Sequence, residues 1–197
     1  MPQKIDRLKK NRPNIQIIGN DTQAGTYILR IRLAESQKLQ FGRFKRGKYI
    51  SLLAGDYTYV GSALAEKGST SLARRLVRHA TRSGEKQPHK IREDMVSHFS
   101  ECNLGPQNPI PINGKKLYWN IDHLLDLQSA EIIDILAIRS TARLENKIAE
   151  FIEHYTDTQI VEKSLGANDA PKYTHVMQVN PDEKWWDTLT KDIADTF

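Results

Sequence analysis

The chain has 197 residues, of which 39% are hydrophobic and 27% are charged, and its formal net charge is +5. This length and composition fit one globular domain with extensions, or at most two small domains, and exclude a largely disordered chain. No apolar run is long enough to span a bilayer, and residues 1–14 lack the apolar centre of a secretory signal. The single cysteine, Cys102, excludes an internal disulfide framework and indicates a reducing compartment, the cytoplasm.

The charge is unevenly distributed along the chain. Residues 72–92 hold seven Lys or Arg against one acid, and residues 40–48 hold four against none. Residues 180–197 instead hold five acids against two lysines, and we expect them to form an acidic C-terminal tail. A basic centre suits a site for a polyanion such as nucleic acid, although a solvated charged face explains the same composition.

The N-terminal part of the chain is predicted to lead into a strand. Residues 1–24 are polar and charged, so we expect an N-terminal extension, with only a weak strand pattern at 15–18. Residues 25–33 alternate apolar and polar side chains, a period of two that is typical of a strand.

Three further short strands are predicted after this one. Residues 41–44 and 49–53 are candidate strands around a turn at 45–47, which contains a glycine. Residues 56–60 are rich in tyrosine, threonine and valine and end at Gly61. Together with 25–33, these segments indicate an antiparallel meander.

Residues 72–82 predict an amphipathic helix that ends near Ser83-Gly84. Its polar side is basic, because four residues share it at helical spacing. These residues are Arg75, Arg78, His79 and Arg82.

The second half of the chain alternates a loop with ordered segments. Residues 91–99 are a further candidate helix, and the prolines and glycines of 103–115 predict a loop. Residues 117–125 are ordered, but their periodicity does not distinguish a strand from a helix. Residues 132–138 have the β-branched apolar profile of a strand buried on both faces, and 143–154 carry a helical apolar stripe. The predicted class is therefore α+β, a small antiparallel or mixed sheet flanked by helices.

Four short motifs occur in an order that suits phosphodiester hydrolysis. The sequence Gly-Thr-Tyr27 opens one strand, and Tyr59-Val-Gly-Ser closes another. The basic helix with Arg75 follows at once, and Glu145 comes near the start of a later helix. Hydrolysis of a phosphodiester needs an activated water, charge stabilisation of the phosphoryl oxygens and proton transfer, which a carboxylate-held cation, an arginine and a proton-handling group can supply.

This ordered set resembles the GIY-YIG nuclease superfamily, and within it the Uri-type endonuclease branch. The resemblance covers roughly 25–179, which we take as the nuclease-like domain, and the segments at 55–63, 117–125 and 166–169 carry the likeness to the branch. The interval between the two motif tyrosines is longer than in compact members of the superfamily. Asn120 stands where the branch usually has a histidine.

The resemblance implies a role for each matching residue. Tyr27 matches the first motif tyrosine, which contacts the phosphate or the water, and Tyr59 matches the second, a general base or an orienter of the water. Arg75 matches the arginine that steadies the pentacovalent phosphate, and His79 matches the histidine that often ends this helix pattern. Glu145 matches the single metal-binding carboxylate, so Mg2+ or Mn2+ is the expected cofactor.

We therefore expect a metal-dependent endonuclease that acts on DNA rather than RNA and has no membrane partner. Cations of the predicted turn and helix are expected to line a groove for the phosphate backbone. These residues are Arg43, Lys45, Arg46, Lys48, Arg74, Arg78, Arg82 and Lys86. One alternative is a non-catalytic nucleic-acid-binding module with the same fold, and another is an interaction protein whose basic face meets an acidic protein.

Overall fold

The computed structural model describes residues 14–166 and 172–197. It confirms the α+β class, because helices pack on a mixed six-stranded sheet beside a small two-stranded one. Residues 1–13 and 167–171, and with them most of the 166–169 motif, lie outside the described residues. The elements in chain order are β1 (Asn14–Gly19), β2 (Gly25–Leu33), β3 (Gln37–Gln40), η1 (Phe44–Arg46), β4 (Tyr49–Leu52), β5 (Gly55–Ala63), α2 (Leu72–His79), α3 (Ile91–Glu101), α4 (Asn120–Leu125), β6 (Ala130–Arg139), α5 (Glu145–Glu153), β7 (Gln159–Ile160), β8 (Val176–Val179) and α6 (Glu183–Thr196).

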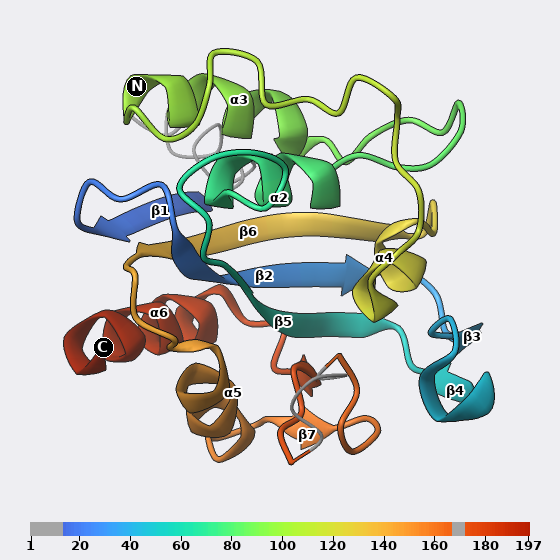
Figure 1. Cartoon of the computed structure of the whole chain (residues 1–197). Coiled ribbons are helices and arrows are strands. Elements are labelled where there is room, and N and C mark those ends of the chain that lie inside the picture. The colour runs from blue at the N-terminus through green and yellow to red at the C-terminus, as the bar shows by residue number, and fades with distance from the viewer. Residues whose placement is uncertain (1–13, 167–171) are drawn as a thin grey trace, which may run out of the picture.

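The large sheet has the strand order β1-β6-β2-β5-β8-β7 (Figure 1). β1 runs parallel to β6, and the other neighbouring strands of the described chain pair antiparallel. β6 lies between β1 and β2 and is buried along most of its length, which confirms the strand predicted at 132–138. β2 confirms the strand predicted at 25–33, and all of its residues except Arg32 are buried.

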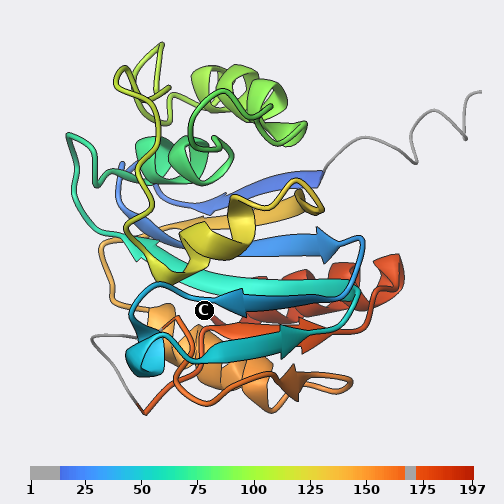
Figure 2. The ribbon, with the colours of Figure 1, turned by 90° about the vertical axis from the view of Figure 1, so that its right-hand side faces the viewer.

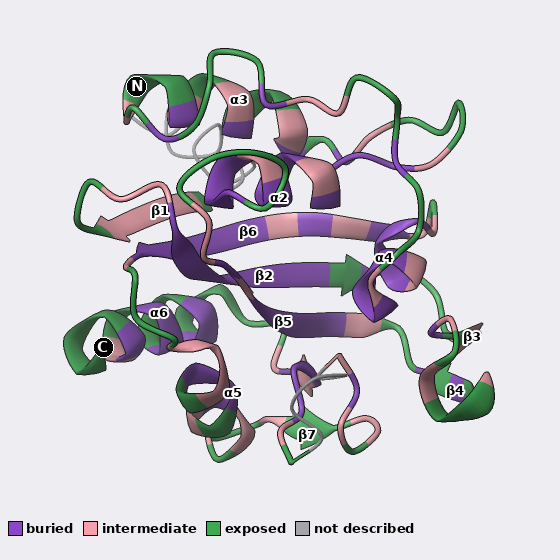
Figure 3. Ribbon diagram, in the orientation of Figure 1, coloured by how far each residue is buried: buried purple, intermediate pink, exposed green. Residues whose placement is uncertain are grey.

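The sheet separates two layers of helices (Figures 1 and 2). Alternate side chains of β2 enter two different cores: Tyr27 packs with α2, α3 and α4, whereas Ile28 packs with α5 and α6. Figure 3 shows this burial along the central strands and on the inward sides of the helices. The second core contains Trp185 and Trp186, so both tryptophans anchor α6 to the sheet.

The predicted meander is wrong, because β3 and β4 pair with each other in a separate hairpin while β2 pairs directly with β5. The first hairpin strand is Gln37–Gln40 rather than 41–44. Phe41 instead turns inward and is fully buried, and Gly42 follows with a φ of 60°. A Cβ at Gly42 would lie 2.9 Å from His123 Nε2, so the hairpin packs closely against α4.

The basic helix is shorter than predicted, since α2 ends at His79 and not near Ser83-Gly84. After the helix, the Arg82 guanidinium turns inward and donates hydrogen bonds to the carbonyls of Gln87 and Ala130. The segment 117–125, which periodicity alone left undecided, contains helix α4.

Both predicted extensions contribute to the domain. The described part of residues 1–24 includes β1, an edge strand that the weak pattern at 15–18 indicated and that pairs with β6. Most of residues 180–197 form α6, with Asp182 as its N-cap and a buried apolar side. Among the described residues, no helix is both long and apolar enough to cross a bilayer.

Candidate active site

A cleft of about 140 Å³ opens where β5, α2, α4 and α5 meet. Three residues named by the resemblance border it: Tyr59 from β5, Arg75 from α2, and Glu145 from the first turn of α5. The other lining residues are Ser62, Trp119, Asn120 and Gly166. Residues that are 86 positions apart in sequence therefore face one space, because α5 starts directly beside the end of β5.

Tyr27 lies behind the cleft and contacts both Tyr59 and His79. The Tyr27 and Tyr59 rings are 6.1 Å apart in an edge-on arrangement, and the Tyr27 and His79 rings are 5.6 Å apart. Gly61 faces Tyr27 across the strand pair, and a Cβ there would lie 2.5 Å from the Tyr27 hydroxyl oxygen. The glycine of the Tyr-Val-Gly motif is therefore required so that the Tyr27 ring can cross over β5.

The Tyr27 hydroxyl and His79 Nε2 form a buried hydrogen bond of 2.7 Å. Burial raises the pKa of the Tyr27 and Tyr59 phenols well above the ordinary value, and the nearby positive charge of Arg75 only partly opposes this rise. Burial also lowers the pKa of His79 from 6.5 to about 4, although the Asp122 carboxylate opposes that shift. At neutral pH both phenols are protonated and the imidazole is neutral, so the Tyr27 hydroxyl is the donor and His79 Nε2 the acceptor of this hydrogen bond.

Asp122 supports His79 from the other side of the ring, where its Oδ1 lies 3.6 Å from His79 Nδ1. Arg78 donates to both carboxylate oxygens at 3.1 and 2.9 Å, and Lys115 Nζ lies 3.4 Å away. Burial alone would raise the pKa of Asp122, but the proximity of His79 and the cations Lys115 and Arg78 hold it well below its usual range. This buried carboxylate favours the His79 tautomer with its proton on Nδ1, which leaves Nε2 to accept from Tyr27.

Arg75 is 8% exposed and faces the cleft, with its guanidinium carbon 4.5 Å from the centre of the Trp119 ring. It forms no ion pair within residues 14–166 and 172–197. A guanidinium that is nearly buried without a carboxylate partner is a strong binding site for an anion.

Glu145 accepts a hydrogen bond from the Ser62 hydroxyl, and its Oε1 lies 3.3 Å from Nδ1 of the buried His175. Burial alone would raise the pKa of Glu145, but the contacts with His175 and Ser62 and the charge of Arg75 lower it. The carboxylate is therefore ionised and held by neighbours, while a quarter of its side-chain surface stays exposed at the cleft.

The family comparison matches residues 26–196 to the model described as "Domain of unknown function DUF123". The chain belongs to this family. The match continues through α6, which agrees with the packing of that helix on the sheet. No curated protein and no solved structure matches the chain.

In this DUF123 chain, Glu145 is a suitable ligand for one divalent cation. It is ionised, borders the cleft, and is oriented by Ser62 and His175. The described residues contain no cluster of three or more His, Cys, Asp or Glu placed for a metal. A single carboxylate still suits Mg2+, which keeps several of its waters and needs few protein ligands.

The eight cations expected to bind nucleic acid have different environments. Arg82 is 5% exposed and bonded to backbone carbonyls, so it is not available to a ligand, contrary to expectation. Arg78 is held by Asp122, and Lys86 by Asp126 at 2.5 Å. Lys45 and Lys48 both pair with Glu162. The remaining three, Arg43, Arg46 and Arg74, form no ion pair with a described residue.

Sequence reasoning missed the residues that support the site. The sequence assigned no role in the site to Asp122, whereas in the structure it is the partner of His79. Trp119 and Lys115 were not singled out at all. No local pattern identifies them, because they lie far from α2 in the sequence and are brought to it by the long loop before α4. The one signal in the sequence was the resemblance of 117–125 to the Uri-type branch.

Proposed function

We propose that this protein is a metal-dependent endonuclease of the GIY-YIG type that hydrolyses phosphodiester bonds in DNA. The observation that carries this proposal is the convergence of all five predicted residues on one cleft: Tyr59, Arg75 and Glu145 line it, and Tyr27 and His79 stand directly behind it. Arg75, which forms no ion pair with a described residue, and the ionised Glu145 supply the cation and the carboxylate that phosphoryl chemistry requires.

The tyrosines form a proton relay in this proposal. Tyr59 borders the cleft beside Tyr27, with the two ring centres 6.1 Å apart, and Tyr27 in turn donates to His79 Nε2. As a water attacks phosphorus, the bond from phosphorus to the leaving oxygen breaks, and that oxygen takes a proton from the solvent. The proton of the attacking water passes to the Tyr59 oxygen, the Tyr59 proton to Tyr27, and the Tyr27 proton to His79. His79 becomes an imidazolium, which the Asp122 carboxylate stabilises. The relay never requires a free tyrosinate, which agrees with the raised pKa values of both phenols.

Arg75 and Glu145 act on the phosphate from two sides of the cleft. Arg75 donates to the non-bridging oxygens, whose negative charge increases in the transition state, and its stacking on Trp119 keeps the guanidinium in place. Glu145 would hold a divalent cation, Mg2+ or Mn2+, which would supply Lewis-acid stabilisation of the charge that develops in the reaction.

The test is a cleavage assay on single-stranded, duplex, branched and flapped DNA and RNA with Mg2+ or Mn2+. We expect cleavage of at least one DNA substrate by the wild type and its loss in Glu145→Gln and Arg75→Ala. Lys191→Ala, which removes an exposed cation of the remote helix α6, is the control and retains cleavage. Absence of cleavage throughout the panel, with DNA binding intact, would instead support the alternative of a non-catalytic nucleic-acid-binding module.

The proposed compartment is the cytoplasm, where the single cysteine stays reduced. Cys102 lies at the end of α3 with intermediate exposure and borders neither the cleft nor the relay.

A further inference from the structure

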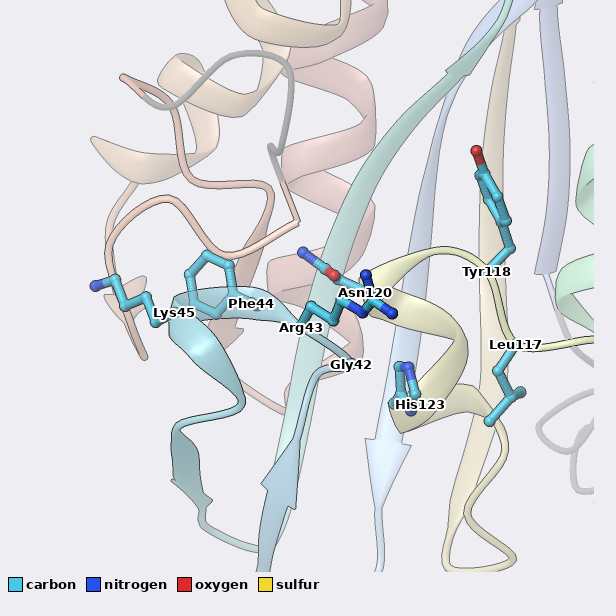
Figure 4. Close-up of a pocket in the computed structure, with 8 residues that line it drawn as sticks. All are labelled: Gly42, Arg43, Phe44, Lys45, Leu117, Tyr118, Asn120 and His123. Carbon is cyan, nitrogen blue, oxygen red and sulfur yellow. The ribbon is translucent and has the colours of Figure 1, made fainter.

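A second, wider space lies beside the cleft, with a volume of about 670 Å³. One wall is the hairpin turn, Gly42–Lys45, and the other is the start of α4 and the chain before it (Figure 4). Asn120 lines both this groove and the cleft, so the two spaces adjoin at one side chain. The close packing of Gly42 on His123 joins the two walls.

The groove is basic and aromatic. Its described lining residues include no Asp or Glu, and Arg43 enters it without an ion pair to any described residue. Lys45 also lines it but is held by Glu162. Tyr118 is 78% exposed, a large exposure for an aromatic ring, and Phe44 lines the hairpin side. A free cation beside an exposed ring complements the phosphate and the base of a nucleotide.

An aromatic series connects this groove to the cleft. The Arg75 guanidinium lies 4.5 Å from the Trp119 ring, and the Trp119 and Tyr118 rings lie 4.9 Å apart, edge to face. These distances place Tyr118 within reach of a nucleotide one or two positions from a scissile phosphate that contacts Arg75. The groove has the volume of a small-ligand pocket, which is enough for one or two nucleotides.

We propose that the groove binds an unpaired nucleotide of the cleaved strand, with its base stacked on Tyr118 and its phosphate held by Arg43. The preferred substrate is then a strand that is single-stranded next to the scissile phosphate. The position of that phosphate rests on the proposed function, whereas binding of a single strand in the groove can be measured without cleavage.

The test measures fluorescence anisotropy with the full chain in EDTA, using a labelled oligothymidine, an oligouridine and a DNA duplex of equal length. We expect tighter binding of the oligothymidine than of the duplex. Tyr118→Ala should weaken oligothymidine binding about tenfold and leave duplex binding within about twofold. Arg43→Ala should weaken it severalfold and lower the slope of log K against log salt by about one.

Tyr49→Ala and Lys38→Ala are the matched controls for loss of an aromatic ring and of a cation. Both residues are exposed on the β3–β4 hairpin, which carries Arg43, but neither lines the groove. Their affinities should match the wild type. Unchanged oligothymidine binding in Tyr118→Ala, or an equal loss for the duplex, would overturn the inference while leaving the nuclease proposal intact. A Tyr118-dependent preference for single strands without any cleavage would support the inference that the groove binds an unpaired nucleotide and would contradict the nuclease proposal. Tighter binding of oligouridine would identify RNA as the single strand.

Discussion

Two buried arginines on opposite faces of the sheet have opposite environments. Arg30 is fully buried, and its guanidinium contacts Asp56 at 2.8 Å, Asp134 and Glu183 at 3.0 Å each, and the carbonyl of Pro181. Arg75 is almost as buried, yet it rests on the Trp119 ring and has no carboxylate partner among the described residues.

This difference separates a structural arginine from a functional one. The carboxylates around Arg30 neutralise its charge. Because they come from β5, β6 and the start of α6, these ion pairs connect the three elements to β2. Within residues 14–166 and 172–197, Arg75 has no such neighbours, and a nearly buried charge without a partner is costly unless a ligand provides one. Burial and partner count together, rather than the residue type, indicate which arginine is available to a phosphate.

The largest expected effect comes from Arg30→Ala, which leaves buried carboxylates without their shared cation. We expect the free energy of unfolding to fall by about 3–5 kcal/mol, measured by urea denaturation. Arg32→Ala is the matched control, because Arg32 contacts the same Asp56 but is half exposed, and its loss should cost about 1 kcal/mol or less. Equal losses in the two variants would contradict the structural role of Arg30.

Arg75→Ala should show the reverse pattern. Cleavage should fall by a factor of about 100 to 1,000, since one transition-state donor is lost. The free energy of unfolding should change by only about 1 kcal/mol, the contribution of the contact with Trp119. Arg75→Lys retains the charge but not the paired N–H donors of the guanidinium, so its activity should lie between that of the wild type and that of Arg75→Ala. A destabilisation as large as that of Arg30→Ala would show that Arg75 is structural as well.

The neutral state of His79 predicts a pH dependence of stability. Its pKa is about 4 in the folded protein and 6.5 unfolded, so between these values the unfolded chain binds the extra proton. The stability that this residue contributes is complete above about pH 6.5 and is lost as the pH falls toward 4, by roughly 3 kcal/mol in total. The free energy of unfolding, measured at several pH values, should show this slope, with a contribution of the same sign from His89. A slope that is identical in His79→Gln would exclude the assignment to His79.

The smallest expected effect is that of Trp119→Leu, which removes the ring beneath the Arg75 guanidinium. We expect KM to rise by a factor of about 3 to 30, because a cation–π contact is worth about 0.5–2 kcal/mol. Thermal unfolding of the same variant is the control for stability. Because Trp119 is only half buried, its loss should change Tm little. Unchanged KM would mean that Arg75 is oriented without this ring.

The sequence by itself determined the α+β class and most of the helices and strands. The apolar periods at 25–33 and 72–82 and the β-branched apolar run at 132–138 are local patterns that need no knowledge of the rest of the fold. It also identified the five candidate site residues through an ordered motif. Only the tertiary structure showed that these five residues meet, which the register of Tyr27 on Gly61 and the placement of α5 beside β5 bring about.

Only the tertiary structure, too, distinguished among the cations. Arg75, Arg78 and Arg82 look alike as polar residues of one predicted helix, yet one faces the cleft, one holds Asp122 and one is bonded to backbone carbonyls. The physical reason is that the role of a charged side chain depends on which groups compensate its charge. For these arginines, groups of the distant segment 115–131 do so, and no local sequence pattern specifies where that segment lies.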